Sequence, residues 1–189
     1  MKALHYAAVL AASAYAAPAT AELTAEYPTV VSLFAKTCVE GELTPAAREQ
    51  AIVTDGGWAA VEPTVNVPGF GISRAIDRNF DYSKPTSIKQ WSRSIDGVTV
   101  QLVLATFPDK RRYPALCALL VPNVKAGWPY DDAFEAAVKA IGLKGKSTDL
   151  PHYFEYSGKV NGAHPVRAEI FGRSQAMAEK NTMHLYIAF

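Results

Sequence analysis

Apolar residues near position 30 recur at the spacing of one helical face. They lie three or four residues apart, at Tyr27, Val30, Val31, Phe34 and Cys38. This period predicts an amphipathic helix that carries Cys38 toward the core, and the following Gly41 predicts its end. Thr44-Pro45 predicts the start of a second helix, because threonine caps a helix start and proline needs no amide hydrogen at the first position. The pair Gly56-Gly57 predicts the end of this helix.

Asp96-Gly97 is the strongest β-hairpin signal in the chain. The pair favours a two-residue turn with positive φ angles, which places Ile95 opposite Val98 and Arg93 opposite Val100. Side chains alternate between the two faces of a strand. One face of this ribbon is therefore predicted to hold Trp91, Ile95, Val98, Val100, Leu102 and Leu104.

A continuously apolar run, Ala115 to Val121, follows this hairpin. Such a run predicts a central strand that is covered on both faces, with Cys117 at its middle. Asp131-Asp132 then predicts the start of a helix, because carboxylates are favoured at helix N-termini, and Gly142 predicts its end.

The last third of the chain predicts a second group of strands. Asn161-Gly162 favours another two-residue turn, in which Val160 faces Ala163, and alternating residues from Met183 to Phe189 predict a final strand. The whole order is two helices, three strands, one helix and three strands. It predicts a single α+β domain over residues 22–189, with one antiparallel sheet of two three-stranded meanders and the helices packed on one face.

Residues 1–21 have the three parts of a cleavable export signal. Lys2 provides the positive charge, an apolar run extends from Tyr6 to Ala17, and Ala19-Thr20-Ala21 fits the cleavage site. Cleavage is expected after Ala21, which places the protein in the periplasm or outside the cell. No later segment approaches the roughly 20 consecutive apolar residues of a membrane-spanning helix, so the mature chain is not expected to span a membrane.

The charge balance argues against nucleic acid as a partner. The chain has 19 basic and 18 acidic residues, and loss of Lys2 with the signal leaves 18 of each. Nucleic-acid binding depends on clustered Lys and Arg side chains that displace counterions. Lys110-Arg111-Arg112 is the one dense basic cluster, and its place between two apolar runs predicts a solvated turn.

Cys38 and Cys117 are the only cysteines. An even pair in an oxidising compartment predicts a disulfide bond, which requires the central strand to pass beneath the first helix. The alternative is a redox-active or nucleophilic cysteine. The chain lacks a Cys-x-x-Cys motif, however, and both residues lie in apolar patterns that disfavour a reactive thiolate.

Patterns for catalysis and metal binding are weak. Three histidines follow the signal, at His152, His164 and His184. The predicted hairpin separates His152 from His164 by roughly seven residues along the strand, so no metal site is expected. Gly71-Ile72-Ser73-Arg74-Ala75 is one residue short of the nucleophile-elbow motif. A small envelope hydrolase that uses Ser73, or a histidine with a nearby carboxylate, is the alternative function.

Aromatic side chains in loops are the remaining lead. Trp128, Tyr130 and Tyr113 are the predicted contact residues, because rigid rings with polar tips are good anchors for a ligand or a protein partner. Packing of the loops on the domain is the other explanation for such rings.

Four features together resemble small exported bacterial proteins of unknown function. They are the export signal, Phe34-x-x-x-Cys38, Gly57-Trp58, and the later apolar strand with Cys117. This resemblance implies neither an activity nor a site. The chain as a whole predicts a non-enzymatic binding or accessory protein without a cofactor, whose partner is another envelope protein or a cell-wall component.

Overall fold

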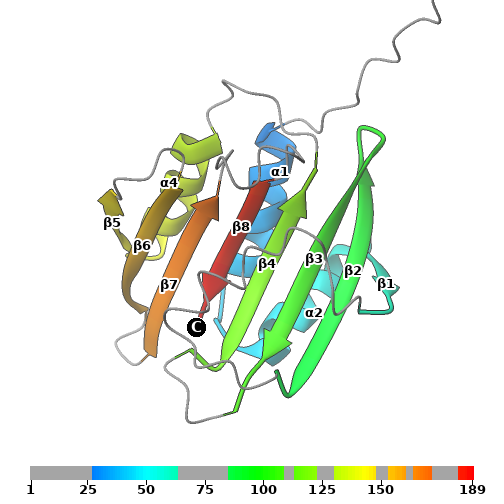
Figure 1. Cartoon of the computed structure of the whole chain (residues 1–189), viewed down its shortest axis with the longest axis horizontal. Coiled ribbons are helices and arrows are strands. Elements are labelled where there is room, and N and C mark those ends of the chain that lie inside the picture. Colours follow the sequence, from blue (N-terminus) through cyan, green and yellow to red (C-terminus); the bar gives the residue numbers. More distant parts are fainter. Residues whose placement is uncertain are drawn as a thin grey trace, which may run out of the picture.

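The fold is organised around one eight-stranded antiparallel sheet. The computed structural model describes residues 27–63, 85–108, 113–122, 130–147, 153–160, 164–171 and 183–189. The strands follow the order β1-β2-β3-β4-β8-β7-β6-β5. The helices lie together on one face of this sheet (Figure 1). This is the α+β class that the sequence predicts.

The chain alternates helical segments with groups of neighbouring strands. The helical elements are α1 (Tyr27–Phe34), the π-helical turn η1 (Ala35–Val39), α2 (Pro45–Asp55) and α4 (Tyr130–Ala140). The strands are β1 (Ala59–Val61), β2 (Ser87–Ile95), β3 (Val98–Thr106), β4 (Ala115–Val121), β5 (Lys144–Ser147), β6 (Tyr153–Val160), β7 (His164–Phe171) and β8 (Met183–Ala188). The two halves of the sheet meet where β4 pairs with β8.

The sequence predicts three strands in each half, whereas the described residues form four in each half. The two additional strands, β1 and β5, form the outer edges of the sheet. All three residues of β1 are exposed, and β5 is Lys-Gly-Lys-Ser. Neither segment shows the alternation of apolar and polar residues from which a strand is predicted.

The first hairpin is confirmed. Asp96 and Gly97 have φ angles of 50° and 79°, and Ile95 pairs with Val98. These positive angles let the turn follow the right-handed twist of the two strands. The six apolar residues predicted to share one face all belong to the main core cluster.

The predicted register of the second hairpin is wrong by one residue. Val160 pairs with His164 instead of Ala163, so three residues separate the paired positions. In the observed register, Tyr156 pairs with Ala168, and both side chains are buried on the helix-covered face. A shift of the pairing by one residue would move the buried side chains of one of these strands to the opposite face of the sheet. Burial of the apolar face therefore outweighs the preference of Asn-Gly for a two-residue turn.

The first helix widens before it ends. The amide of Glu40 donates to the carbonyl of Ala35 at 2.8 Å, a span of five residues that defines the π-helical turn. Thr37 is buried in this turn, and its hydroxyl donates to the carbonyl of Leu33 at 2.7 Å. The hydroxyl is therefore satisfied within the helix, as a buried polar group must be. Gly41 follows with a φ of 85°.

The second helix has the predicted caps. The hydroxyl of Thr44 accepts a hydrogen bond from the amide of Ala47 at 3.3 Å, and Pro45 is the first helical residue. Gly56 adopts the left-handed conformation that ends the helix.

The main core lies between the sheet and the helices. Phe34 of α1 and Phe134 of α4 stack with ring centroids 5.5 Å apart, and Phe134 meets the ring of Tyr156 in β6 at 5.8 Å. Aromatic pairs of this kind contribute about 0.5 to 1.5 kcal/mol beyond the burial of their area. The three rings join two helices to the second half of the sheet.

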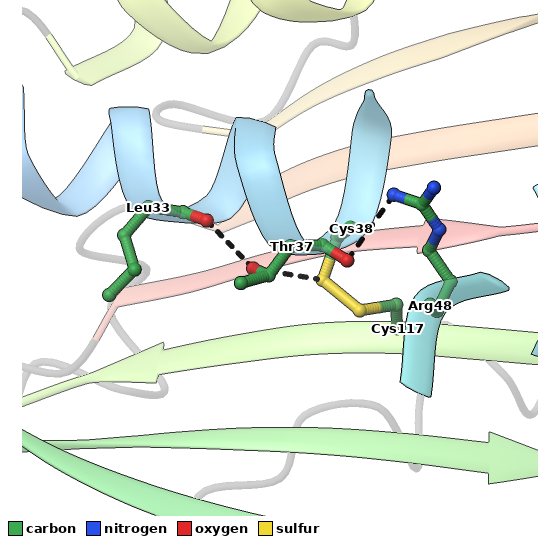
Figure 2. The surroundings of a disulfide bond; sticks show 5 residues. All are labelled: Leu33, Thr37, Cys38, Arg48 and Cys117. Atoms are coloured by element: carbon green, nitrogen blue, oxygen red, sulfur yellow. Dashed lines mark hydrogen bonds between the residues drawn. A yellow bond between two sulfur atoms is a disulfide. The ribbon is translucent and has the colours of Figure 1, made fainter. Parts of the chain in front are cut away.

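The predicted disulfide bond between Cys38 and Cys117 is confirmed. It joins η1 to β4 with a Cα–Cα distance of 5.5 Å, and both residues are fully buried (Figure 2). All seven residues of β4 are buried, as predicted for a strand covered on both faces. The bond therefore fixes the helical layer to the middle of the sheet.

Arg48 supports the π-helical turn from α2. Its Nη1 atom donates to the carbonyl of Thr37 at 3.3 Å, and the residue is only 2% exposed (Figure 2). Desolvation lowers the pKa of this guanidinium, while Glu40 and Glu42 act in the opposite direction. The hydrogen bond satisfies a carbonyl at the end of the first helical segment.

The predicted export signal, residues 1–21, lies outside the residues that the structure describes. Among the helices that it does describe, none combines the length and the apolar character needed to cross a membrane.

Loss of the disulfide bond is expected to destabilise the fold strongly. The bond closes a loop with a sequence separation of 79 residues, for which loop-closure entropy predicts a stabilisation of about 4 to 5 kcal/mol. Urea unfolding with and without reductant measures the difference. A Cys38→Ala/Cys117→Ala variant serves as the control, because reductant should not change its midpoint. Equal unfolding free energies for the oxidised and reduced wild type would contradict this role.

Candidate binding groove

An open groove of about 540 Å³ lies between the first helical segment and the β2–β3 hairpin. Its helical wall is formed by Thr29, Ser32, Leu33 and Lys36. The facing wall is formed by Asp55, at the end of α2, and by Arg93, Ser94, Ile95 and Asp96, at the end of β2. The volume falls within the range of about 300 to 1,000 Å³ that is typical of small-ligand sites.

The helical wall is polar because α1 is amphipathic. Val30 and Phe34 face the core, whereas Thr29, Ser32 and Lys36 are exposed along the opposite stripe at spacings of three and four residues. Within the part of the chain that the structure describes, neither of the two hydroxyls has a hydrogen-bond partner. The wall therefore presents two hydroxyls and one ammonium group to the groove.

Arg93 belongs to the facing wall of the groove. It lies between Trp91 and Ile95 on the helix-covered face of β2, where alternation would otherwise place an apolar residue. Its Nη1 atom forms an ion pair with Asp55. A Cβ atom added at Gly57 would lie 2.5 Å from the Cζ atom of Arg93, so the guanidinium rests against the glycine backbone. Asp55 and Gly57 together hold this side chain in place.

The groove carries charges of both signs in equal number. Lys36 and Arg93 are cationic, and Asp55 and Asp96 are anionic. Arg93 is already paired with Asp55, whereas Lys36 has no ion-pair partner among the described residues. This arrangement suits a polar ligand held by charge-assisted hydrogen bonds.

Of the three predicted aromatic contact residues, Tyr113 is the one whose side chain the structure describes. Tyr113 is 3% exposed and packs with Leu116, Ala118 and Tyr186 on the face of the sheet away from the helices. Its ring therefore does not face solvent. Trp128 lies outside the described residues, and so does the side chain of Tyr130, which begins α4.

Of the residues proposed for the alternative hydrolase, His184 is the one whose side chain the structure describes. Ser73 and His152 lie outside the described residues, and of His164 only the backbone, at the start of β7, is described. His184 of β8 is 1% exposed, and its desolvation lowers its pKa to about 4. Across the described ranges, no three or more His, Cys, Asp or Glu residues are grouped so that they could bind a metal ion.

Sequence reasoning missed every residue of the groove, although two signals were present. The exposed stripe of α1 is visible in the helical period that predicts its buried stripe. Arg93 is a charged residue between the apolar Trp91 and Ile95 on one strand face, which indicates the edge of the core. Neither signal shows that the exposed stripe of α1 faces Arg93, because the two segments lie about sixty residues apart in the chain.

Acidification is expected to destabilise the protein through His184. The pKa of this side chain is about 4 in the folded state and 6.5 in the unfolded state, so the unfolded chain binds the proton more readily between these values. The free energy of unfolding should stay constant above pH 6.5 and fall by about 3 kcal/mol as the pH drops toward 4. Urea unfolding of the wild type and of His184→Gln at both ends of this range measures the difference. The same pH dependence in both proteins would show that burial of His184 is not its cause.

No protein-family model, curated protein or solved structure matches this chain. Its function has to be inferred from its own residues.

Proposed function

We propose that this chain is a non-enzymatic binding or accessory protein that acts in the periplasm or is secreted. It holds a segment of another envelope protein or of a cell-wall component in the groove between α1 and the β2–β3 hairpin. The observation that carries the proposal is the groove itself. It presents two hydroxyls and Lys36, which has no ion-pair partner among the described residues, opposite the Arg93–Asp55 pair.

Export is supported by the disulfide bond. Structural disulfides persist in oxidising compartments and are rare where thiols are kept reduced. The Cys38–Cys117 bond is fully buried in the core, as expected for a bond that stabilises the fold. The signal features of residues 1–21 point to the same compartment.

A binding role is supported by the rigidity of both walls. The helical wall is attached to the sheet by the disulfide bond and by the contact between Phe34 and Phe134. The facing wall is held by the pair of Arg93 with Asp55. A site that is already formed loses less conformational entropy when a ligand binds, which raises affinity without additional contacts.

Nucleic acid does not suit the groove as a partner. The groove has two cationic and two anionic residues, and phosphate backbones would be repelled by Asp55 and Asp96. The balanced charge of the whole chain also argues against a nucleic-acid partner.

A double substitution in the helical wall should weaken partner binding strongly. Ser32→Trp fills the groove and Lys36→Glu reverses the charge on its helical wall. Both residues are exposed, so the fold should tolerate the change. The mature protein is immobilised, envelope extracts are passed over it, and the affinity of each retained partner is then measured after purification. We expect a loss of at least about tenfold, because charge-assisted hydrogen bonds are the stronger polar contacts.

Lys159→Glu is the matched control. It makes the same charge change at an exposed position of β6, outside the groove. Unchanged affinity in the double variant, or equal losses in both proteins, would contradict the proposed site.

A further inference from the structure

The charge that the groove offers to a ligand is that of Lys36. Arg93 and Asp55 form an ion pair with each other, and Asp96 has an interaction partner of its own. Lys36 is exposed, and among the described residues it has no ion-pair partner. The charge that remains for a ligand to neutralise is therefore positive, and it lies on the helical wall.

Two hydroxyls lie next to this ammonium group. Ser32 precedes Lys36 by four residues and Thr29 precedes Ser32 by three, so the three side chains are successive neighbours along the first helical segment. Helical side chains lean toward the N-terminus, which brings the ammonium group of Lys36 toward Ser32. An anionic oxygen between these two residues would accept a hydrogen bond from each, and such charge-assisted bonds are the stronger polar contacts.

The rest of the groove suits uncharged polar groups. Lys36 is the last residue of the helical wall, whose other polar residues carry hydroxyls. The facing wall offers the hydroxyl of Ser94 and the guanidinium of Arg93, which is bound through Nη1 to Asp55. A guanidinium has more N–H donors than this one contact uses, so Arg93 can still donate to a neutral carbonyl. The ligand is therefore expected to be anionic at one end and uncharged along the remainder.

The small apolar surface of the groove favours a peptide over an acyl chain. Leu33 and Ile95 also line the groove, but each is only 6% exposed. An acyl chain gains free energy from the apolar area that it buries, so it would gain little here. None of the described lining residues is aromatic, so a sugar ring has no aromatic face to stack on. A peptide instead needs hydrogen-bond partners for its backbone, and it ends in a carboxylate.

We propose that the groove binds the C-terminal end of a peptide, with its free carboxylate between Lys36 and Ser32. The assignment rests on the proposed function, for which it names the class of ligand. Thr29 binds the preceding peptide unit, and Arg93 and Ser94 donate to carbonyls from the facing wall. The volume of about 540 Å³ restricts the bound part to a few residues.

Nuclear magnetic resonance titration of the full mature protein with N-acetyl-trialanine tests the proposal. This probe has one carboxylate, at its C-terminus, and no ammonium group. We expect it to shift the backbone amides of residues 29–36 and 93–96. N-acetyl-trialanine amide, which lacks the carboxylate, should bind about fivefold more weakly, as for a solvent-exposed charge pair.

Two further probes separate the possible sources of a carboxylate. The amide of N-acetyl-Ala-Glu-Ala carries its carboxylate on an internal side chain, and hexanoate carries one on an acyl chain. Both should bind more weakly than N-acetyl-trialanine, because neither places a terminal carboxylate at Lys36 with peptide units along the groove.

Lys36→Met isolates the carboxylate contact. In this variant N-acetyl-trialanine and its amide should bind equally, whereas Lys36→Arg should keep the preference for the free carboxylate. Lys159→Met, an exposed substitution on β6, should leave both affinities unchanged. Gly57→Ala displaces Arg93, because a Cβ there meets the guanidinium, and should weaken both peptides to a similar extent.

Several results would overturn the inference. These are no binding of N-acetyl-trialanine at millimolar concentration, equal binding of this peptide and its amide, or binding of hexanoate or the internal-glutamate peptide as tight as that of N-acetyl-trialanine. If one of them occurs while Ser32→Trp/Lys36→Glu still weakens capture of an envelope partner, the groove is a binding site for another chemistry. If that double variant captures partners normally as well, the proposed function itself fails.

Discussion

The bond between Cys38 and Cys117 determines where the helical layer sits. It connects the π-helical turn to the central strand, and the buried groups around it depend on that placement. Thr37 satisfies its hydroxyl on Leu33, and Arg48 reaches the carbonyl of Thr37 from the next helix. The same anchor orients α1, so that one stripe of this helix packs on the core and the opposite stripe forms a wall of the groove.

The groove exists because the helices cover only part of the sheet. Along β2, Trp91 and Ile95 are buried against the helical layer, but Arg93 between them carries a charge on the same face. A buried or partly buried charge requires a partner, and Asp55 at the end of α2 provides it. The ion pair of Arg93 with Asp55 therefore lies at the edge of the core, and it also provides polar surface next to α1.

Local chemistry made much of this fold predictable. Four features follow from residue types whose effects act over a few positions or through one covalent bond. They are the caps of α2, the turn at Asp96-Gly97, the fully buried β4 and the disulfide bond. Edge strands β1 and β5 were not predictable, because they are held by backbone pairing and not by an apolar pattern. The groove also depends on two distant segments, and the burial of Tyr113 depends on tertiary packing that no local pattern reveals.

We expect the disulfide bond to hold the helical wall of the groove against the sheet. Amide hydrogen exchange in the oxidised protein and in Cys38→Ala/Cys117→Ala, under conditions where both remain folded, tests it most directly. In the variant, exchange should accelerate mainly in residues 27–39, which contain α1 and η1, while β6 and β7 keep their protection. Equal acceleration throughout the sheet, or no change in α1 and η1, would contradict it.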